Sequence, residues 1–491
     1  MKRSFDVVIM GGGPAGASAA RCLAAWGRSV ALFTRAPSGP AIAESLPPSC
    51  LALFERIGVR AAIERAGFVR ATGNTVWWGA EPARTERFGS EALGFQVDRA
   101  VFDALLLDEA ERAGAVVRRK ALVRAVSKGP SLHSGRQRVQ VEDDGVSVEV
   151  EAHWVLDCTG RAGLLARHGV RRPGVHARTL ALVGIWEGNW PLDDDTHTLV
   201  ESYENGWAWS VPLGAGRRCV TVMVDPATTT VTAALDDVYR AELARTVHLA
   251  ALLRSPTLVG HAWARDASSY FSSPVGEDGR LIVGDAASFV DPLSSFGVKK
   301  AMASAWLAAV VVNTCLDTGH LIAPALALHE SRERGMYDSL MRGSAMLARE
   351  ATTAHDTAFW SGRTFADSRD GDADVDVVSL RTDPDVLAAF GEIRRRNSMH
   401  LCRADTVTES ERPTVRGNRV VLESHLVTPA FERGIRYVRS VDLITLADIA
   451  CEQNQVGDMY EAYNRVAPTV PLPDFLGALS VLVGKGLLVD S

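Results

Sequence analysis

Three glycines near the N-terminus, Gly11, Gly13 and Gly16, have the spacing of a phosphate-binding turn. They follow the apolar run Phe5–Met10 and precede Ala17–Trp26, a segment rich in alanine and leucine that is typical of a helix. Gly11 allows the tight turn, Gly13 lets a pyrophosphate approach the backbone, and Gly16 lets the helix pack closely on the strand. The free N–H groups at the start of the helix would bind the phosphates. The stretch therefore predicts a dinucleotide site.

The residues after the second expected strand, Ser29–Phe33, do not decide which dinucleotide binds. An acidic residue that binds the ribose hydroxyls is usual at this place, and the chain has Thr34 and Arg35 instead. Thr34 could form one hydrogen bond with the ribose, and Arg35 could stack on the adenine ring. Nicotinamide and flavin dinucleotides both remain open at this point.

A second stretch, Arg280–Val298, narrows the choice. It reads as a strand, Leu281–Val283, that delivers Gly284 and Asp285, followed by a long helix that extends through Leu316. An acidic side chain fixed at a strand end can hold a ribityl hydroxyl, and a helix N-terminus can face the electron-rich ring of a flavin. In this order behind the glycine-rich turn, these features favour FAD.

Alternating apolar and polar residues from Thr179 to Asp225 predict an antiparallel sheet inserted into the nucleotide-binding domain. Within this stretch, Trp207 and Trp209 are two residues apart and share one face of a strand. Two large aromatic side chains on one face belong either to the hydrophobic core or to the wall of an aromatic pocket.

The composition limits the possible partners. With 53 basic and 59 acidic residues among 491, the net charge is −6, which excludes the basic surface expected for binding nucleic acid or an anionic membrane. Seven cysteines are scattered without metal-ligand spacing, which favours reduced thiols in a cytoplasmic protein that has no metal site. The apolar run Ala301–Leu316 is shorter than the roughly 20 residues that a bilayer requires.

Several motifs together resemble the FAD-dependent monooxygenases of the hydroxybenzoate-hydroxylase fold, over about residues 4 to 340. They are GGGPAG at Gly11, VDRAVFD at Val97, DCTG at Asp157 and GDAASFVDPLSSFGV at Gly284. With ESLPPS at Glu44 and GWAWSVP at Gly206, the chain is more narrowly similar to the flavin-dependent halogenase branch. The resemblance implies one bound FAD, electrons from NAD(P)H or a partner reductase, O2 as oxidant, and a flavin C4a-hydroperoxide as the reacting species.

The same resemblance assigns the site residues. It implies pyrophosphate binding by the three glycines, adenine contacts from Arg35 and Val123, ribityl–pyrophosphate contacts from Arg99 and Asp285, and isoalloxazine contacts from residues 292–299. The whole implied cofactor set is Gly11, Gly13, Ala15, Gly16, Thr34, Arg35, Glu44, Ser45, Arg99, Val123, Gly284, Asp285, Pro292, Gly297, Val298 and Lys299. Candidate substrate-pocket residues are Trp207, Trp209 and Phe296. No catalytic base is singled out by the sequence.

Two departures from the halogenase pattern bear on the reaction. Halogenases of this branch carry a relay lysine shortly before the G-x-T-x-x-W-G strand, and that position is Ala71 here, flanked by Arg70 and Thr72. The halide-contacting Ser-Ser-Gly is also changed, because Phe296 replaces its second serine. The chain thus resembles the lysine-lacking flavoproteins that hydroxylate a peptidyl tryptophan during quinone cofactor maturation. A halogenase and a non-catalytic flavin-bound assembly factor are the alternatives.

The expected fold is α/β, or α+β overall, with a Rossmann-like FAD-binding domain, an inserted antiparallel-sheet substrate domain and a C-terminal winged-helix-like domain. The expected FAD-binding domain comprises residues 1–75, 96–175 and 260–340, and the inserted domain residues 76–95 and 176–259. Residues 341–440 are expected to form a helical or irregular connection, and residues 441–491 the winged-helix-like domain.

The C-terminal segment is acidic. Its Arg465 and Lys485 are outnumbered by Asp442, Asp448, Glu452, Asp458, Glu461, Asp474 and Asp490, so phosphate-backbone binding is excluded. Two interpretations of this domain remain, which are a docking platform for a polypeptide substrate and a packing or dimerisation domain.

Overall fold

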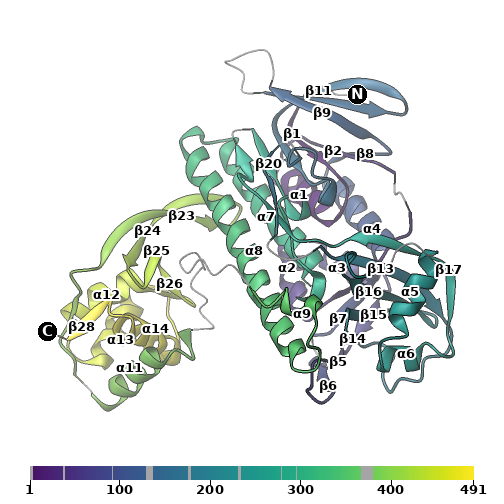
Figure 1. Cartoon of the computed structure of the whole chain (residues 1–491). Coiled ribbons are helices and arrows are strands. Elements are labelled where there is room, and N and C mark those ends of the chain that lie inside the picture. The colour runs from purple at the N-terminus through teal and green to yellow at the C-terminus, as the bar shows by residue number, and fades with distance from the viewer. Residues whose placement is uncertain are drawn as a thin grey trace. The chain divides into compact units, whose positions relative to one another are not determined.

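The computed structural model divides into two compact units, residues 1–367 (unit 1) and residues 368–491 (unit 2) (Figure 1). The structure describes residues 4–36, 39–90, 92–128, 136–167, 169–174, 178–229, 234–277, 279–294, 296–365, 380–396 and 398–490. Each unit has its own hydrophobic core and is described by itself.

The first sheet of unit 1 is Rossmann-like. Its strands run in the order β19-β20-β11-β1-β2-β8, and β10 and β9 continue from β11. The pairs β1–β11, β1–β2, β2–β8 and β11–β20 are parallel, as a dinucleotide-binding sheet requires. The strand bounds are β1 Ser4–Met10, β2 Val30–Thr34, β8 Val116–Arg119, β9 Leu122–Lys128, β10 Gln137–Asp143, β11 Val146–Asp157, β19 Gly276–Glu277 and β20 Arg280–Ile282.

Four long helices accompany this sheet. They are α1 (Pro14–Ala25), α4 (Arg99–Arg112), α7 (Gly297–Cys315) and α8 (Ile322–Thr352), and α1 packs against both α4 and α7 (Figure 1). The side chain of Asp98 accepts a hydrogen bond from the Ala100 N–H at 2.8 Å, which makes Asp98 the N-cap of α4. Helix α7 is buried along almost its whole length, which explains its apolar sequence.

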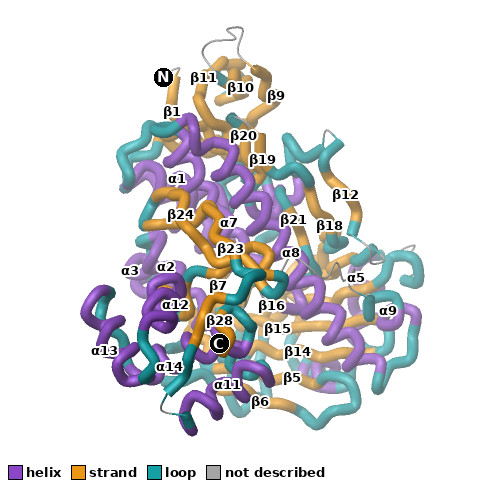
Figure 2. The backbone as a smooth tube through the Cα atoms, turned by 90° about the vertical axis from the view of Figure 1, so that its left-hand side faces the viewer, coloured by secondary structure: helices purple, strands orange, loops and turns teal. Residues whose placement is uncertain are grey.

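A second, seven-stranded sheet has the order β17-β13-β16-β15-β14-β5-β6, and Figure 2 shows β16, β15, β14 and β5 side by side. Its strands are β5 Gly73–Trp77, β6 Arg84–Arg87, β13 Leu180–Glu187, β14 Thr198–Tyr203, β15 Gly206–Gly214, β16 Arg217–Val224 and β17 Thr257–Asp266. The antiparallel sheet predicted over Thr179–Asp225 is confirmed by β13–β16, whereas β14 and β5 pair in parallel. The sheet extends beyond the expected boundaries at residues 76 and 259, because β5 begins at Gly73 and β17 ends at Asp266.

Shorter elements complete unit 1. One three-stranded sheet has the order β3 (Ala43–Leu46), β7 (Gly94–Asp98) and β4 (Val69–Ala71). Another has the order β12 (Arg171–Pro173), β18 (Tyr270–Ser272) and β21 (Ser288–Phe289). The short helices are α2 Leu51–Ile57, α3 Arg60–Arg65, α5 Leu235–Leu243, α6 His248–Leu252 and α9 Ala358–Ser361. Single 3-10 turns are η1 Pro48–Cys50, η2 Gly160–Ala162, η3 Gly284–Ala286, η4 Pro292–Ser294 and η5 Gly319–Leu321.

The seven-stranded sheet separates two cores. Trp78 and Trp207 belong to an inner core that includes Trp360 of α9. Trp77 packs on an outer core that contains Tyr239 of α5 and Leu249 of α6. Neighbouring residues of a strand point to opposite faces of the sheet. Trp77, the last residue of β5, and Trp78, which follows it, therefore pack in different cores.

Unit 2 combines helices and strands around one core. Its elements are α11 Pro384–Arg395, β22 Leu401–Arg403, β23 Thr408–Arg416, β24 Arg419–Thr428, β25 Phe431–Ile435, β26 Tyr437–Val438, β27 Val441–Asp442, α12 Leu443–Glu452, α13 Val456–Val466, α14 Leu472–Gly484 and β28 Leu488–Asp490. Three helices followed by a strand agree with the winged-helix-like expectation for the C-terminal segment. The final strand β28 pairs antiparallel with β22, which lies outside that segment.

Residues 341–440, expected to form a helical or irregular connection, contain helices and also strands that were not expected. The first part of this range completes α8, and strands β23, β24 and β25 form an antiparallel sheet. These strands escaped prediction because β23 reads TESERPTVR, polar on both faces and containing Pro413, so it lacks the alternation of a half-buried strand. In the part of the chain that the structure describes, no helix is long and apolar enough to cross a membrane.

The extent of the unit 2 core predicts the outcome of truncation. A chain that ends at residue 367 should keep unit 1 folded, with a melting temperature close to that of the full chain. A chain that ends at residue 440 should aggregate, because Leu426, Phe431 and Ile435 lose the core residues Leu443 and Phe475, and each exposed side chain costs about 2 kcal/mol. Thermal unfolding and gel filtration test this, and a 1–440 chain as stable and monomeric as the 1–367 chain would contradict it.

Candidate active site

Close backbone contacts build the glycine-rich turn between β1 and α1. Gly11 has a φ of +100°, and its N–H donates to the Phe33 carbonyl at 2.8 Å. A Cβ on Gly16 would lie 1.9 Å from the Gly11 carbonyl oxygen, and a Cβ on Gly11 would lie 2.3 Å from the carbonyl oxygen of Cys158. Glycine is therefore the residue that both positions accept.

Gly13 differs from its two neighbours in the motif, because a Cβ there meets side chains only at 4.0 Å, from Arg99 and Asp103. Gly13 is also the N-cap of α1 and offers no side-chain acceptor to the first N–H groups of the helix. The start of α1 thus presents free donors to a phosphate. Gly13 keeps this approach open, whereas Gly11 and Gly16 shape the turn itself.

A charged cluster adjoins the turn. Arg99 pairs with Glu44 at 3.3 Å and with Asp103 at 2.9 Å. Burial raises the pKa of Glu44, although the charge of Arg99 opposes this effect. Burial alone would lower the pKa of Arg99, but Asp103, Glu44 and Asp285 together raise it. The structure thus brings Arg99, Glu44 and Asp285 together next to Gly13, although β7–α4, β3 and η3 are far apart in sequence.

The turn η3 packs directly on the first turn of α1. Gly284 has a φ of +65°, and a Cβ there would lie 3.0 Å from the Cβ of Ala15. The Lys300 ammonium, only 4% exposed, donates to Asp285 Oδ1 at 3.2 Å and to the carbonyls of Gly284 and Ser288. Lys300 was not predicted as a site residue. Its position on the buried face of α7, three residues after Gly297, is the signal that could have found it.

Thr34, Arg35 and Val123, which are expected near the adenine and its ribose, have different surroundings. The Thr34 side chain lies against Gly12, where a Cβ would be 2.8 Å from Thr34 Oγ1. Arg35 is exposed, and Val123 is buried in a core cluster with Phe33 and Met10.

Ser45, another residue of the expected cofactor set, accepts a hydrogen bond from Thr198 Oγ1 at 2.9 Å, so it links β3 to β14.

The segment expected at the isoalloxazine begins at η4 and continues into α7. Pro292 opens η4, and Gly297 is the exposed first residue of α7, where a Cβ would meet nothing within 4 Å. Val298 is buried, whereas Lys299 Nζ donates to Ser49 Oγ at 3.0 Å and lies 4.9 Å from the centre of the Phe296 ring. The free N–H groups of α7 and the Lys299 ammonium make this end of the helix electropositive.

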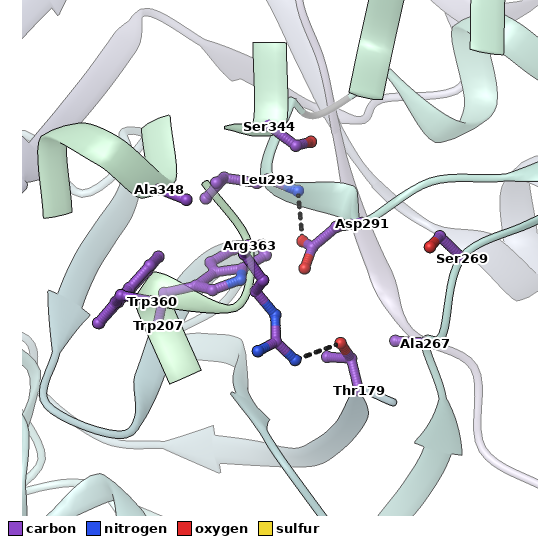
Figure 3. Close-up of a pocket in the computed structure, with 10 residues that line it drawn as sticks. All are labelled: Thr179, Trp207, Ala267, Ser269, Asp291, Leu293, Ser344, Ala348, Trp360 and Arg363. Atoms are coloured by element: carbon purple, nitrogen blue, oxygen red, sulfur yellow. Dashed lines mark hydrogen bonds between the residues drawn. The ribbon is translucent and has the colours of Figure 1, made fainter. Parts of the chain in front are cut away.

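A small cavity of about 20 Å³ lies between the seven-stranded sheet and α8 (Figure 3). It is lined by Thr179, Trp207, Ala267, Ser269, Asp291, Leu293, Ser344, Ala348, Trp360 and Arg363. Its volume suffices for about one water molecule. Trp207 contributes to the wall, and Trp209 stacks on Trp207 with ring centres 4.8 Å apart. Phe296 is not part of this lining.

Asp291 and Arg363 are the charged groups in this lining (Figure 3). Burial raises the pKa of Asp291 to about 6, and Arg363, the Leu293 N–H and the Trp207 indole N–H limit the rise. Arg363 donates to the Phe359 carbonyl at 2.7 Å and to Thr179 Oγ1 at 3.0 Å, and burial lowers its pKa.

Three further polar groups border the cavity without a hydrogen-bond partner of normal geometry. The Trp207 indole N–H, the Ser269 hydroxyl and the Ser344 hydroxyl are all buried. A polar guest in the cavity would satisfy them. Neither Asp291 nor Arg363 was predicted as a site residue. The Asp-Pro pair at residues 291–292 could have pointed to Asp291, whereas Arg363 follows an ordinary helical segment and gives no signal in the sequence.

Comparison with known proteins identifies the chain. The family described as FAD binding domain matches residues 4–317. The chain belongs to the FAD binding domain family. It is a flavoprotein oxidoreductase of the FAD-dependent monooxygenase and halogenase superfamily, and it binds FAD.

Tryptophan 2-halogenase from Chondromyces crocatus is 29% identical over 383 residues, which cover 74% of this chain and 71% of that protein. The crystal structure of CmlS, a flavin-dependent halogenase, has a TM-score of 0.81 at 22% identity and covers 100% of this chain and 96% of that one. The structure of the peptidyl tryptophan dihydroxylase QhpG, described as essential for tryptophylquinone cofactor biogenesis, has a TM-score of 0.71 at 22% identity and covers 99% of this chain and 100% of that one. The two solved structures share the fold of this flavoprotein.

The geometry of the flavoprotein fits FAD. The open backbone at Gly13 and the start of α1 would accept a pyrophosphate, Arg99 lies beside this space, and Lys300 holds Asp285 in η3, just after β20. The exposed start of α7 and Lys299 would face the electron-rich edge of the ring system if the flavin binds as expected. When bound and reduced, FAD supplies the electrons that activate O2, so the enzyme also requires a source of reduced flavin.

The contrast between Gly13 and Gly16 predicts two distinct variants. Gly13→Val should fold with an unchanged apo melting temperature but lose flavin absorbance, because its side chain fills the space for the pyrophosphate. Gly16→Val should also lose thermal stability, because its Cβ would overlap the Gly11 carbonyl at 1.9 Å. Visible spectra after FAD reconstitution and thermal unfolding measure both effects. Retained flavin in Gly13→Val would contradict the assignment of the site.

Proposed function

We propose that the enzyme is an FAD-dependent monooxygenase that hydroxylates an indole ring, in a tryptophan side chain of a peptide or protein that matures into a quinone cofactor. The observation that carries this proposal is the environment of Ala71, where halogenases of the branch have their relay lysine. Ala71 is fully buried in β4 and provides no ammonium group.

The neighbours of Ala71 do not replace that lysine. The Arg70 guanidinium lies 4.2 Å from the centre of the Phe95 ring. Thr72 Oγ1 donates to Asp194 Oδ2 at 2.7 Å, on the outer side of the sheet. A guanidinium also remains protonated throughout the physiological pH range, so Arg70 cannot act as a neutral amine. These contacts favour oxygen transfer over halide transfer.

Asp291 is the proposed acceptor for the proton that the ring loses when oxygen has been added. Its carboxylate lies at the wall that Trp207 and Leu293 form, next to the segment expected to face the flavin ring. A carboxyl group whose pKa is about 6 is mostly ionised at neutral pH and remains a stronger base than an exposed aspartate. The aromatic lining of Trp207 and Trp360 would exclude bulk water from the reaction.

A substrate presented on a polypeptide agrees with the presence of unit 2. The peptidyl tryptophan dihydroxylase structure covers 99% of the chain and therefore includes a counterpart of unit 2, and so does the structure of the halogenase CmlS, which covers 100%. We propose that unit 2 docks a polypeptide substrate and that unit 1 modifies it. The small volume of the cavity at Trp207 implies that side chains must move when an indole ring enters.

Halogenation is the second candidate, favoured by the 29% identity to a tryptophan halogenase. A single experiment separates the two reactions. Incubation of a tryptophan-containing peptide with reduced FAD, chloride and labelled O2 should add one labelled oxygen per turnover and no chlorine, as measured by mass spectrometry. Chlorine in the product would overturn the hydroxylase proposal, and oxygen from unlabelled water would also contradict it.

The proposed role of Asp291 predicts a characteristic pH profile. The base must be ionised, so kcat should fall as the pH drops through about 6, to about one tenth of its plateau at pH 5. Asp291→Asn should lose this dependence and lower kcat by about 10²-fold or more. Flavin absorbance should stay unchanged, because Asp291 lies outside the glycine-rich turn. A variant with near-normal kcat and an unaltered pH profile would exclude Asp291 as the base.

A further inference from the structure

A second, larger cavity of about 650 Å³ lies on the outer face of the seven-stranded sheet. Thr75 and Trp77 of β5 line it, whereas Val76 and Trp78 belong to the inner core near the Trp207 cavity. Because alternate residues of a strand face opposite sides, the two cavities lie across the sheet from each other. The volume is within the roughly 300–1,000 Å³ of small-molecule sites.

The cavity extends between two ends of different character. One end is formed by the loop at residues 191–197 and by Arg87 of β6. The other end is covered by α6, which lies near β5 and β6 at the lower edge of Figure 1. Thr75, Thr85 and Leu199 form the floor between them.

Buried side chains hold the loop in place. The Arg218 guanidinium is 1% exposed and donates to the carbonyls of Asp195 at 2.7 Å and His197 at 2.6 Å. Gln96 Nε2 donates to the Thr196 carbonyl at 2.9 Å. Burial lowers the pKa of Arg218 to about 10, so keeping this guanidinium charged inside the protein costs desolvation free energy. A loop anchored in this way is preorganised for binding.

The loop end of the cavity carries a fixed negative charge. Asp194 accepts hydrogen bonds from Thr72 Oγ1 at 2.7 Å, the Thr196 N–H at 2.9 Å and Thr196 Oγ1 at 2.7 Å. Burial opposes ionisation, but these bonds and nearby His197 lower the pKa of Asp194 to about 2. Its side chain is still 40% exposed, so the carboxylate can accept further hydrogen bonds.

A positive charge stands at the same end. Arg87 pairs through its backbone with Gly73, the neighbour of the Thr72 that holds Asp194. Arg87 is exposed and has no ion-pair partner among the described residues, Asp194 included. The Asp194 carboxylate and the Arg87 guanidinium line the same end of the cavity but do not pair with each other. This arrangement suits a ligand that has both an ammonium and a carboxylate group.

The α6 end is apolar and aromatic. Trp77 stacks on His248 with ring centres 4.5 Å apart and planes inclined by 9°. Ala251 and Leu252 of α6 add to the apolar lining at this end, and Leu199 continues it along the floor. This end suits a large hydrocarbon or aromatic group attached to the zwitterionic head.

We propose that this outer cavity binds a free α-amino acid with a large apolar or aromatic side chain. Asp194 would accept from the ammonium group, Arg87 would donate to the carboxylate, and the side chain would lie along Trp77. The site is separate from the flavin and does not depend on the proposed hydroxylation.

Calorimetry on the full-length, FAD-loaded protein tests the proposal. L-Tryptophan, L-phenylalanine or L-leucine should bind, whereas tryptamine and indole-3-propionate, which each lack one of the two charges, should bind at least tenfold more weakly. Equal affinity for tryptophan and tryptamine, or no binding of any of the amino acids at millimolar concentration, would overturn the proposal.

Variants locate the binding. Arg87→Gln should weaken amino-acid binding at least tenfold, and it should fold normally because Arg87 is exposed and unpaired. Arg84→Gln is the matched control, since Arg84 lies on the same strand but three residues away, outside the lining, and pairs with Glu350. Binding that is unchanged in Arg87→Gln, or that falls equally in both variants, would place the amino acid elsewhere and refute this site.

Discussion

The approach of the α1 helix to the end of β1 is the constraint on which the nucleotide-binding half of the enzyme depends. A Cβ on Gly16 would lie only 1.9 Å from the Gly11 carbonyl oxygen. The close approach is therefore possible because neither Gly11 nor Gly16 has a side chain. It lets the carbonyl of Cys158, the residue after β11, contact Gly11, and it lets Gly284 pack on Ala15. The same close packing sets Asp285, Glu44 and Arg99 beside the phosphate-binding turn. A single backbone contact therefore fixes the positions of residues from four separate segments.

Local chemistry made part of this arrangement predictable. The glycine spacing, the Asp98 cap and the alternation of β13–β16 are each encoded within a few residues, and the structure has the turn, the helix start and the strands at those places. The residues implied by family resemblance at Arg99, Glu44 and Asp285 also meet in space. Their separation in sequence is large, so this grouping came from the motifs and not from any periodicity.

The unpredicted features depend on contacts that no local pattern encodes. Burial under α8 raises the pKa of Asp291, and Arg363, which is more than 70 residues further along the chain, lowers it. Lys300 is buried although lysine is usually exposed, because Asp285 and two carbonyls surround it. In unit 2, the polar strand β23 is stabilised by hydrogen bonding to β24, which composition does not reveal. Phe296 lies beside Lys299, and its contact with the substrate stays a prediction.

The consecutive tryptophans of the β5 segment have a thermodynamic consequence. Trp77 forms part of one compartment and Trp78 part of the core around the other, so a single strand is a shared wall. A guest that binds one side only when β5 adopts a particular position changes the free energy of occupying the other side. Linkage would make such an effect reciprocal, so that substrate in the inner compartment would alter the affinity of the outer one by the same factor. The parallel pairing of β5 with β14 fixes this shared wall within the seven-stranded sheet.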